Sequence, residues 1–138
     1  YRCGQVKPEH LRTHARTAQA LEQIAEIQKG NILIIAGQLG LRHRGRSTRW
    51  ARECFIGNEC GLTSMMGCAI ALTHPERFVR LEELDMDLPG DEFDDPGSAV
   101  RWDRAPCLFS NVDRLGFFAE PVSHARDFLG SASFFLPQ

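Results

Sequence analysis

The chain has 138 residues, of which 43% are hydrophobic and 25% are charged, and its formal net charge at pH 7 is -2. This composition is ordinary for a globular protein. It excludes a disordered chain, a collagen-like fibre and a protein whose overall charge attracts nucleic acid or anionic membranes. No apolar run reaches the roughly 18 residues of a membrane span, so we predict a single cytoplasmic domain over residues 1–138 that does not contact a membrane.

The strongest periodic pattern lies between Pro8 and Lys29. Apolar residues recur there every three or four positions, at Leu11, Ala15, Ala18, Leu21, Ile24 and Ala25. This spacing predicts an amphipathic helix that starts near Pro8 and ends before Gly30.

A short apolar run follows between Asn31 and Ala36, and its β-branched residues favour a buried strand. Glycines and arginines then predict an irregular connection that extends to about Ser47.

A short helix is predicted from Thr48 to Phe55, followed by a turn at Gly57 and Asn58. The next segment, Leu62 to Thr73, is apolar on nearly all sides and contains the small residues Ser64, Gly67, Cys68 and Ala71. We predict that it forms the central buried helix and ends at His74, before Pro75.

The second half of the chain contains a run of acids from Glu82 to Asp95, interrupted by Pro89 and Gly90, which predicts a solvated loop. Two short helices are expected, at Ser110 to Leu115 and at Glu120 to Leu129. The apolar residues Phe134 to Leu136 should be buried, either on the core or in a homodimer.

Together these elements predict a mainly α fold, a single compact helix-rich domain around the helix at Leu62 to Thr73. An α+β fold with one short strand pair is the alternative.

Two groups of residues were considered as metal ligands. His10 and His14 are four positions apart and would share one face of the first helix, but no third ligand accompanies them. Cys54, Cys60 and Cys68 lack the tight Cys-x-x-Cys spacing of structural zinc sites. We therefore predict no metal and no cofactor. Because the chain has five cysteines, an odd and irregularly spaced set, free thiols in a reducing compartment are expected.

One cysteine could instead be a nucleophile. Cys60 or Cys68 would then use His74 or His124 as its base, because a thiolate is stabilised near the start of a helix. The alternative is an inert, buried thiol.

The single concentrated basic segment is the best candidate for a binding site. It contains an aromatic ring among its cations, at Arg42, His43, Arg44, Arg46, Arg49, Trp50 and Arg52. Such a segment can bind the phosphates and stack on the bases of a nucleic acid. Alternatively, its charges are solvated or pair with the acids between Glu82 and Asp95.

The segment from Cys60 to Ala69, followed by Pro75 and Phe78, resembles a group of small bacterial and phage proteins. In those proteins a Cys-Gly-Thr segment opens a helix rich in small residues. This chain departs from that pattern at Leu62, Met65 and Cys68, where the group has Thr, Cys and Gly. The resemblance covers about a third of the chain and implies no activity, because the group has none assigned.

The function that follows is a non-enzymatic binding or accessory protein, because groups capable of acid, base or nucleophilic chemistry do not cluster. Nucleic-acid binding through Arg42 to Arg52 and thiol catalysis through Cys60 or Cys68 are the alternatives. We expect a homo-oligomer.

Overall fold

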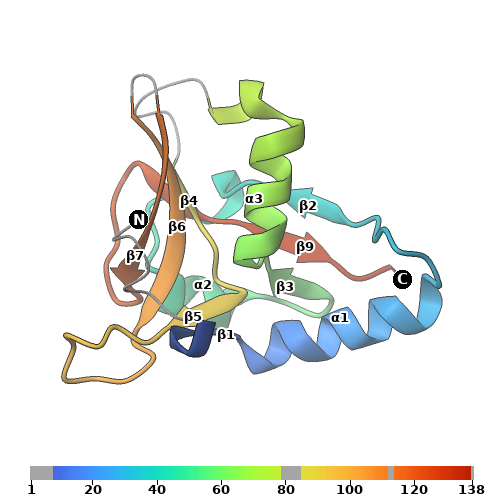
Figure 1. Cartoon of the computed structure of the whole chain (residues 1–138), viewed down its shortest axis with the longest axis horizontal. Helices are drawn as coiled ribbons and strands as arrows, with labels where there is room; N and C mark the ends of the chain where they lie inside the picture. Colours follow the sequence, from blue (N-terminus) through green and yellow to red (C-terminus); the bar gives the residue numbers. More distant parts are fainter. Residues whose placement is uncertain (1–7, 79–84, 112–113, 138) are drawn as a thin grey trace.

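The computed structural model describes residues 8–78, 85–111 and 114–137 (Figure 1). In chain order its elements are η1 (Pro8–His10), β1 (Leu11–Thr13), α1 (Ala15–Ile27), β2 (Ala36–Gln38), η2 (Leu41–His43), α2 (Thr48–Cys54), β3 (Glu59–Gly61), α3 (Ser64–Thr73), η3 (Pro75–Phe78), β4 (Asp85–Asp87), β5 (Asp91–Phe93), β6 (Arg104–Asn111), β7 (Arg114–Pro121), β8 (Leu129–Ser131) and β9 (Ser133–Phe135).

The fold is α+β, and the predicted mainly α fold is wrong. Helix accounts for 32% of the structure and strand for 31%, with three α-helices among the described residues. A curled mixed sheet forms a half-barrel, and a second, smaller sheet lies beside α3 and α1 (Figure 1). Within the described part of the chain, no helix is both long enough and apolar enough to span a membrane.

The larger sheet is organised around β6. Its strand order is β1-β5-β6-β4-β8, and β7 pairs with β6 along its length, from Arg104 opposite Pro121 to Asn111 opposite Arg114. The β4–β8 pair is parallel and the other pairs are antiparallel.

The helices predicted at Ser110 to Leu115 and Glu120 to Leu129 are therefore wrong. Ser110 to Leu115 belongs to the β6–β7 hairpin, apart from residues 112–113, which lie outside the described residues. Between Pro121 at the end of β7 and Leu129 at the start of β8 the chain forms turns and an irregular connection. In the hairpin, pairing between β6 and β7 has overridden the local helix signals.

The smaller sheet has the order β2-β9-β3, so the strand nearest the C-terminal end lies between two earlier ones. Phe134 of β9 is fully buried, which confirms the prediction that this apolar tail packs on the core. The strand predicted at Asn31 to Ala36 is wrong, because β2 begins at Ala36 and both Ile32 and Ile34 are 80% exposed.

The first helix is shorter than predicted. The helix is amphipathic, but it begins at Ala15 and its buried face is Thr17, Ala20 and Ile24, so of the six apolar positions predicted to face the core only Ile24 is buried. The residues before it belong to β1, which pairs with β5.

The third helix begins and ends close to the predicted positions. The Thr63 hydroxyl accepts a hydrogen bond from the Met66 amide, and the Asp91 carboxylate accepts one from the Ser64 amide. Only one face of α3 is buried, so the prediction of a central helix enclosed on all sides is wrong.

The acidic segment was predicted to be a solvated loop, and this is also wrong within the described residues 85–95. It contains β4 and β5, and its Asp87, Asp91 and Asp94 side chains are buried. Gly90 lies where an added Cβ would be 2.3 Å from the Gly61 carbonyl oxygen, so two backbones touch here. Residues 82–84 lie outside the described residues.

Candidate functional site

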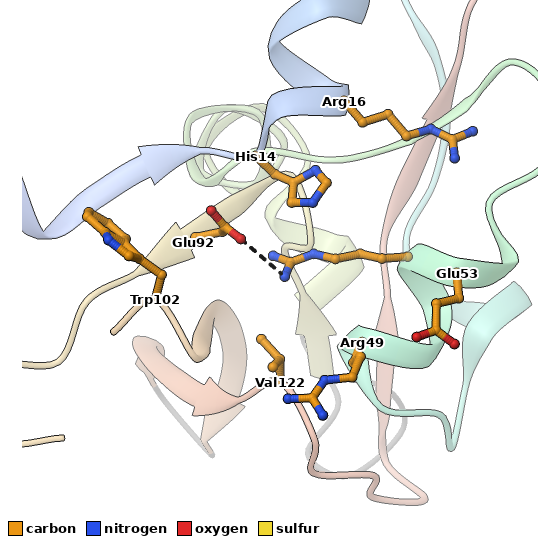
Figure 2. Close-up of a pocket in the computed structure, with 8 residues that line it drawn as sticks. His14, Arg16, Arg49, Glu53, Glu92, Trp102 and Val122 are labelled. Atoms are coloured by element: carbon orange, nitrogen blue, oxygen red, sulfur yellow. Dashed lines mark ion pairs between the residues drawn. The ribbon is translucent and has the colours of Figure 1, made fainter. Parts of the chain in front are cut away.

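An open cleft of about 480 Å³ lies where α1, α2 and β5 meet (Figure 2). Its lining combines cations, carboxylates and two apolar side chains: His14, Arg16, Arg49, Arg52, Glu53, Glu92, Trp102 and Val122. In the view of Figure 2, Trp102 and Arg49 lie on opposite sides of the cleft, with Glu92 between them.

Arg52 and Glu92 form the rigid part of this cleft. The Arg52 guanidinium donates hydrogen bonds to the carbonyl oxygens of Pro89 (3.0 Å) and Asp91 (2.9 Å), and it lies 3.8 Å from a Glu92 carboxylate oxygen. The other Glu92 oxygen is 2.7 Å from Arg12 Nε. Glu92 is thereby held between two guanidinium groups and positions Arg52 in the cleft.

His14 contributes a neutral ring to the cleft. Burial lowers the pKa of this half-buried histidine, and Arg52, Arg16 and Arg12 lower it further, while Glu92 acts in the opposite direction. The imidazole is therefore uncharged at neutral pH. The same cations that depress its pKa create a positive potential that favours an anion.

Arg49 is the cation available to a ligand. Its side chain is exposed, and within the described residues its guanidinium has no hydrogen bond or ion pair. Arg16 has a single long hydrogen bond, from Nη2 to the Gly57 carbonyl oxygen at 3.3 Å. Glu53 adds a negative charge to the same side of the cleft.

Trp102 gives the cleft an aromatic wall. Its φ of 58° is unusual for a bulky residue, and such strained backbone is often found at functional sites. The guanidinium carbon of Arg12 lies 4.1 Å from the centre of its ring, a cation–π contact that holds the ring in place.

A small inner recess adjoins the cleft. Thr17, Phe55, Gly61 and Pro89 line it together with His14, Arg16 and Arg52, and its volume of about 10 Å³ admits roughly one water molecule or one ligand atom. A ligand in the outer cleft could therefore insert no more than a single atom toward the core.

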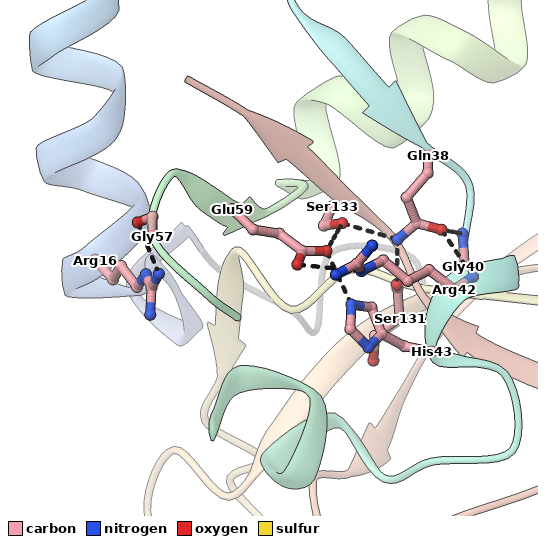
Figure 3. Close-up of polar contacts among 9 residues, drawn as sticks. All are labelled: Arg16, Gln38, Gly40, Arg42, His43, Gly57, Glu59, Ser131 and Ser133. Carbon is pink, nitrogen blue, oxygen red and sulfur yellow. Dashed lines mark hydrogen bonds and ion pairs between the residues drawn. The ribbon is translucent and has the colours of Figure 1, made fainter. Parts of the chain in front are cut away.

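A second polar cluster surrounds the buried carboxylate of Glu59 (Figure 3). One Glu59 oxygen accepts hydrogen bonds from His43 Nε2 (2.9 Å) and Ser133 Oγ (2.6 Å), and the other is 3.4 Å from Arg42 Nε. The Gln38 amide in turn donates to Ser133 Oγ at 2.8 Å.

The hydrogen bonds of this cluster connect its side chains in a different order from those of a catalytic triad, because the Glu59 carboxylate lies between His43 and Ser133. A serine nucleophile needs the histidine itself as its base. Glu59 and Ser133 are also fully buried, and His43 is nearly so. The cluster therefore joins the η2 segment to β3 and β9 and has no catalytic geometry.

The basic segment does not form one surface. Arg49 and Arg52 line the cleft, while Arg42 and His43 pair with Glu59. Arg44 donates to the Asp127 carbonyl oxygen at 2.8 Å, and the guanidinium of Arg46 stacks on Trp50 at 3.6 Å. Pairing within the molecule, the alternative considered for this segment, thus accounts for several of its members, although Glu59 was not among the acids expected as partners.

The candidate metal and thiol residues are not brought together. His10 and His14 do not share a helix, because α1 begins after both. Cys54, Cys60, Cys68 and Cys107 are free thiols, and Cys3 lies outside the described residues.

Neither candidate nucleophile has a histidine base among its described contacts. Cys60 is buried in the core, and burial raises the pKa of the exposed Cys68 on α3. His74 and His124 pair instead with Glu76 and Glu120.

Sequence reasoning missed Arg16, Glu53, Trp102 and Val122. These residues come from separate segments that only the fold brings together, and the sequence contains no spacing signal that links them.

Comparison with known proteins gives no match to a protein family, to a curated protein or to a solved structure. The resemblance in the segment from Cys60 to Ala69 therefore stays a prediction. The class that the fold and the cleft define is an α+β protein with an open, arginine-lined cleft.

Proposed function

We propose that the protein is a non-enzymatic binding protein that holds a small anionic ligand, with a carboxylate or phosphate group, in the cleft of Figure 2. The observation that carries this proposal is Arg49, an exposed guanidinium at the cleft without a partner in the described residues. Guanidinium groups bind carboxylates and phosphates through paired, charge-assisted hydrogen bonds.

The neighbouring residues support an anion over a cation. Arg52 and Arg16 add positive charge, and Glu92 is already occupied by Arg12 and Arg52. The neutral His14 can donate one further hydrogen bond, and Trp102 offers an apolar surface to the rest of the ligand.

A binding role is favoured over catalysis by the same lining. Among the described residues that line it, the outer cleft has no serine, threonine or cysteine, and its Glu92 carboxylate is held by two arginines. Such a site can orient an anion but supplies no activated nucleophile.

The test is a calorimetric titration with inorganic phosphate, sulfate and citrate at constant ionic strength. Arg49→Gln should weaken binding about tenfold or more, because a hydrogen bond to a charged group contributes roughly 1.5–3 kcal/mol. Arg126→Gln removes the same charge outside the cleft and should have little effect. Failure of all three anions to bind, or equal loss in both variants, would refute the proposal.

Single-stranded nucleic acid is the second candidate. It is favoured by one observation: α2 carries Arg49 at the cleft, and its partly exposed Trp50 stacks with Arg46. An aromatic ring beside cations can stack on a base while the phosphate is neutralised.

This alternative predicts binding to unrelated single strands that weakens steeply with salt. Replacing Arg44, Arg46 and Arg49 by Ala should then reduce affinity similarly for every strand, because phosphate contacts carry no base information. Absence of binding at low salt would eliminate it.

A further inference from the structure

The cleft contains one charge that the binding of a simple anion does not explain. Glu53 is exposed on α2, and within the described residues its carboxylate has no hydrogen bond or ion pair. An unpaired carboxylate in an anion-binding cleft repels the anion that the arginines attract. The other acid of the lining, Glu92, is already held by Arg12 and Arg52. Glu53 is therefore the acid that can bind a positive group of the ligand.

Glu53 and Arg49 present opposite charges from one side of α2. They are four residues apart, a spacing at which an arginine and a glutamate can pair along a helix. No ion pair joins them (Figure 2). A carboxylate offers only acceptors and a guanidinium offers only donors. A group that satisfies both carries an ammonium next to a carboxylate, as an α-amino acid does at neutral pH.

The apolar part of the cleft is joined to this charged pair by backbone hydrogen bonds. The Arg49 amide donates to the Val122 carbonyl oxygen at 2.9 Å, and the Val122 amide donates to the Asp103 carbonyl oxygen at 2.8 Å. Trp102, whose ring is in contact with Arg12, directly precedes Asp103. The charged pair and the apolar side chains of Val122 and Trp102 are thus parts of one lining.

The inner recess limits where the rest of a ligand can lie. Its volume of about 10 Å³ admits roughly one atom, whereas the outer cleft, at about 480 Å³, is of the size that holds small molecules. A side chain larger than a methyl group must therefore stay in the outer cleft. There it meets the apolar surfaces of Trp102 and Val122.

We propose that the ligand of this cleft is an α-amino acid with an apolar side chain. Its carboxylate binds Arg49, its ammonium binds Glu53, and its side chain lies against Trp102 and Val122. This assignment rests on the proposed function, because it takes Arg49 as the residue that holds the anionic group. Glu53 then selects an amino acid over a simple carboxylate, since it attracts the ammonium of the first and repels the second.

Calorimetric titration at pH 7 and constant ionic strength, with four matched ligands, tests this proposal. L-Phenylalanine carries both charges and an apolar group. 3-Phenylpropionate lacks the ammonium, phenethylamine lacks the carboxylate, and L-alanine lacks the phenyl ring. L-Phenylalanine should bind about tenfold more tightly than each of the others, because a hydrogen bond between charged groups and the burial of a ring each contribute a factor of this order.

Variants assign the two charges separately. Glu53→Gln should weaken the binding of L-phenylalanine about tenfold and should not weaken that of 3-phenylpropionate, because only the first has an ammonium. Arg49→Gln should weaken the binding of both ligands. Glu22→Gln is the matched control, since it removes the same charge at an exposed position of α1 outside the cleft, and it should change neither affinity.

The outcomes separate this proposal from the function on which it rests. Equal affinity for L-phenylalanine and 3-phenylpropionate, or the same effect of Glu53→Gln on both, would overturn it. Binding of 3-phenylpropionate that Arg49→Gln abolishes would in that case leave the anion-binding function standing. Failure of all four ligands, with phosphate or sulfate still bound through Arg49, would also overturn this proposal alone. Equal affinity for L-alanine and L-phenylalanine would overturn the assignment of an apolar side chain.

Discussion

The buried carboxyl group of Asp87 should make stability fall as the pH rises toward neutrality. Asp87 is 2% exposed, in β4 between β6 and β8. Burial raises its pKa from 3.8 to about 7, with Thr48 acting in the opposite direction and Glu120 and Asp85 adding to the rise. The folded protein therefore retains a proton that the unfolded chain has lost.

The size of the effect follows from the two pKa values. Below about pH 4 Asp87 is protonated in both states, so its contribution to stability is complete there. Between about pH 4 and pH 7 only the folded state binds the proton, and the free energy of unfolding falls by about 1.4 kcal/mol per pH unit. A rise from 3.8 to about 7 thus corresponds to a loss of about 4 kcal/mol, which does not grow further at higher pH.

Asp87→Asn tests this reasoning because it keeps the shape of the side chain and removes the ionisation. Urea unfolding at several pH values should show parent and variant nearly equal at pH 4, with the variant more stable by a few kcal/mol at pH 8. Asp127→Asn, at an exposed position, controls for the change in net charge. A difference between parent and Asp87→Asn that does not vary with pH, or a variant that is less stable at pH 8, would refute the assignment.

Three further outcomes follow from the packing. Gly67→Leu should lower the melting temperature by an amount equivalent to roughly 1–3 kcal/mol, because its side chain would overlap Leu88; a variant that melts like the parent would contradict the packing of α3. Glu59→Ala should destabilise by about 3 kcal/mol in urea unfolding, since it removes the shared acceptor of the buried polar cluster, and a cost below 1 kcal/mol would argue against that role. Iodoacetamide should label Cys68 in the native protein and leave Cys60 unmodified until unfolding; rapid native labelling of Cys60 would contradict its burial.

Local sequence signals predicted the ends of those helices whose boundaries are set by adjacent residues. The end of α3 was predicted closely because Pro75 follows it directly, and α2 was predicted to within one residue. The existence of α1 was also predicted from its spacing, but its buried face was not, because burial of Thr17 and Ala20 depends on the distant segments that pack against the helix.

Strand pairing was the part that local patterns could not reveal. The acids of β4 and β5 resemble a solvated loop when taken by themselves, and they are buried only because β6, β8 and β1 supply the neighbouring strands. The aromatic and apolar run in β7 is equally compatible with either element until its register with β6 is known.

The cleft depended on the same long-range pairing. Two of its arginines, Arg49 and Arg52, were in the predicted basic segment, but their companions come from α1, β5 and the residues around Trp102. Contacts with residues distant in sequence determine which arginines of that segment line the cleft. The spacing of the arginines in the sequence does not.

The position of β9 has a consequence for folding during synthesis. β2 and β3 both form their sheet contacts with β9, so each must wait until Ser133–Phe135 has left the ribosome. β4 likewise acquires its parallel neighbour only with Leu129–Ser131. During that interval the edges of β2 and β3 and the surface that Phe134 later covers are open to other chains. Because pairing between strands distant in sequence is slow, we expect the nascent chain to depend on chaperones more than a helical bundle of equal length would.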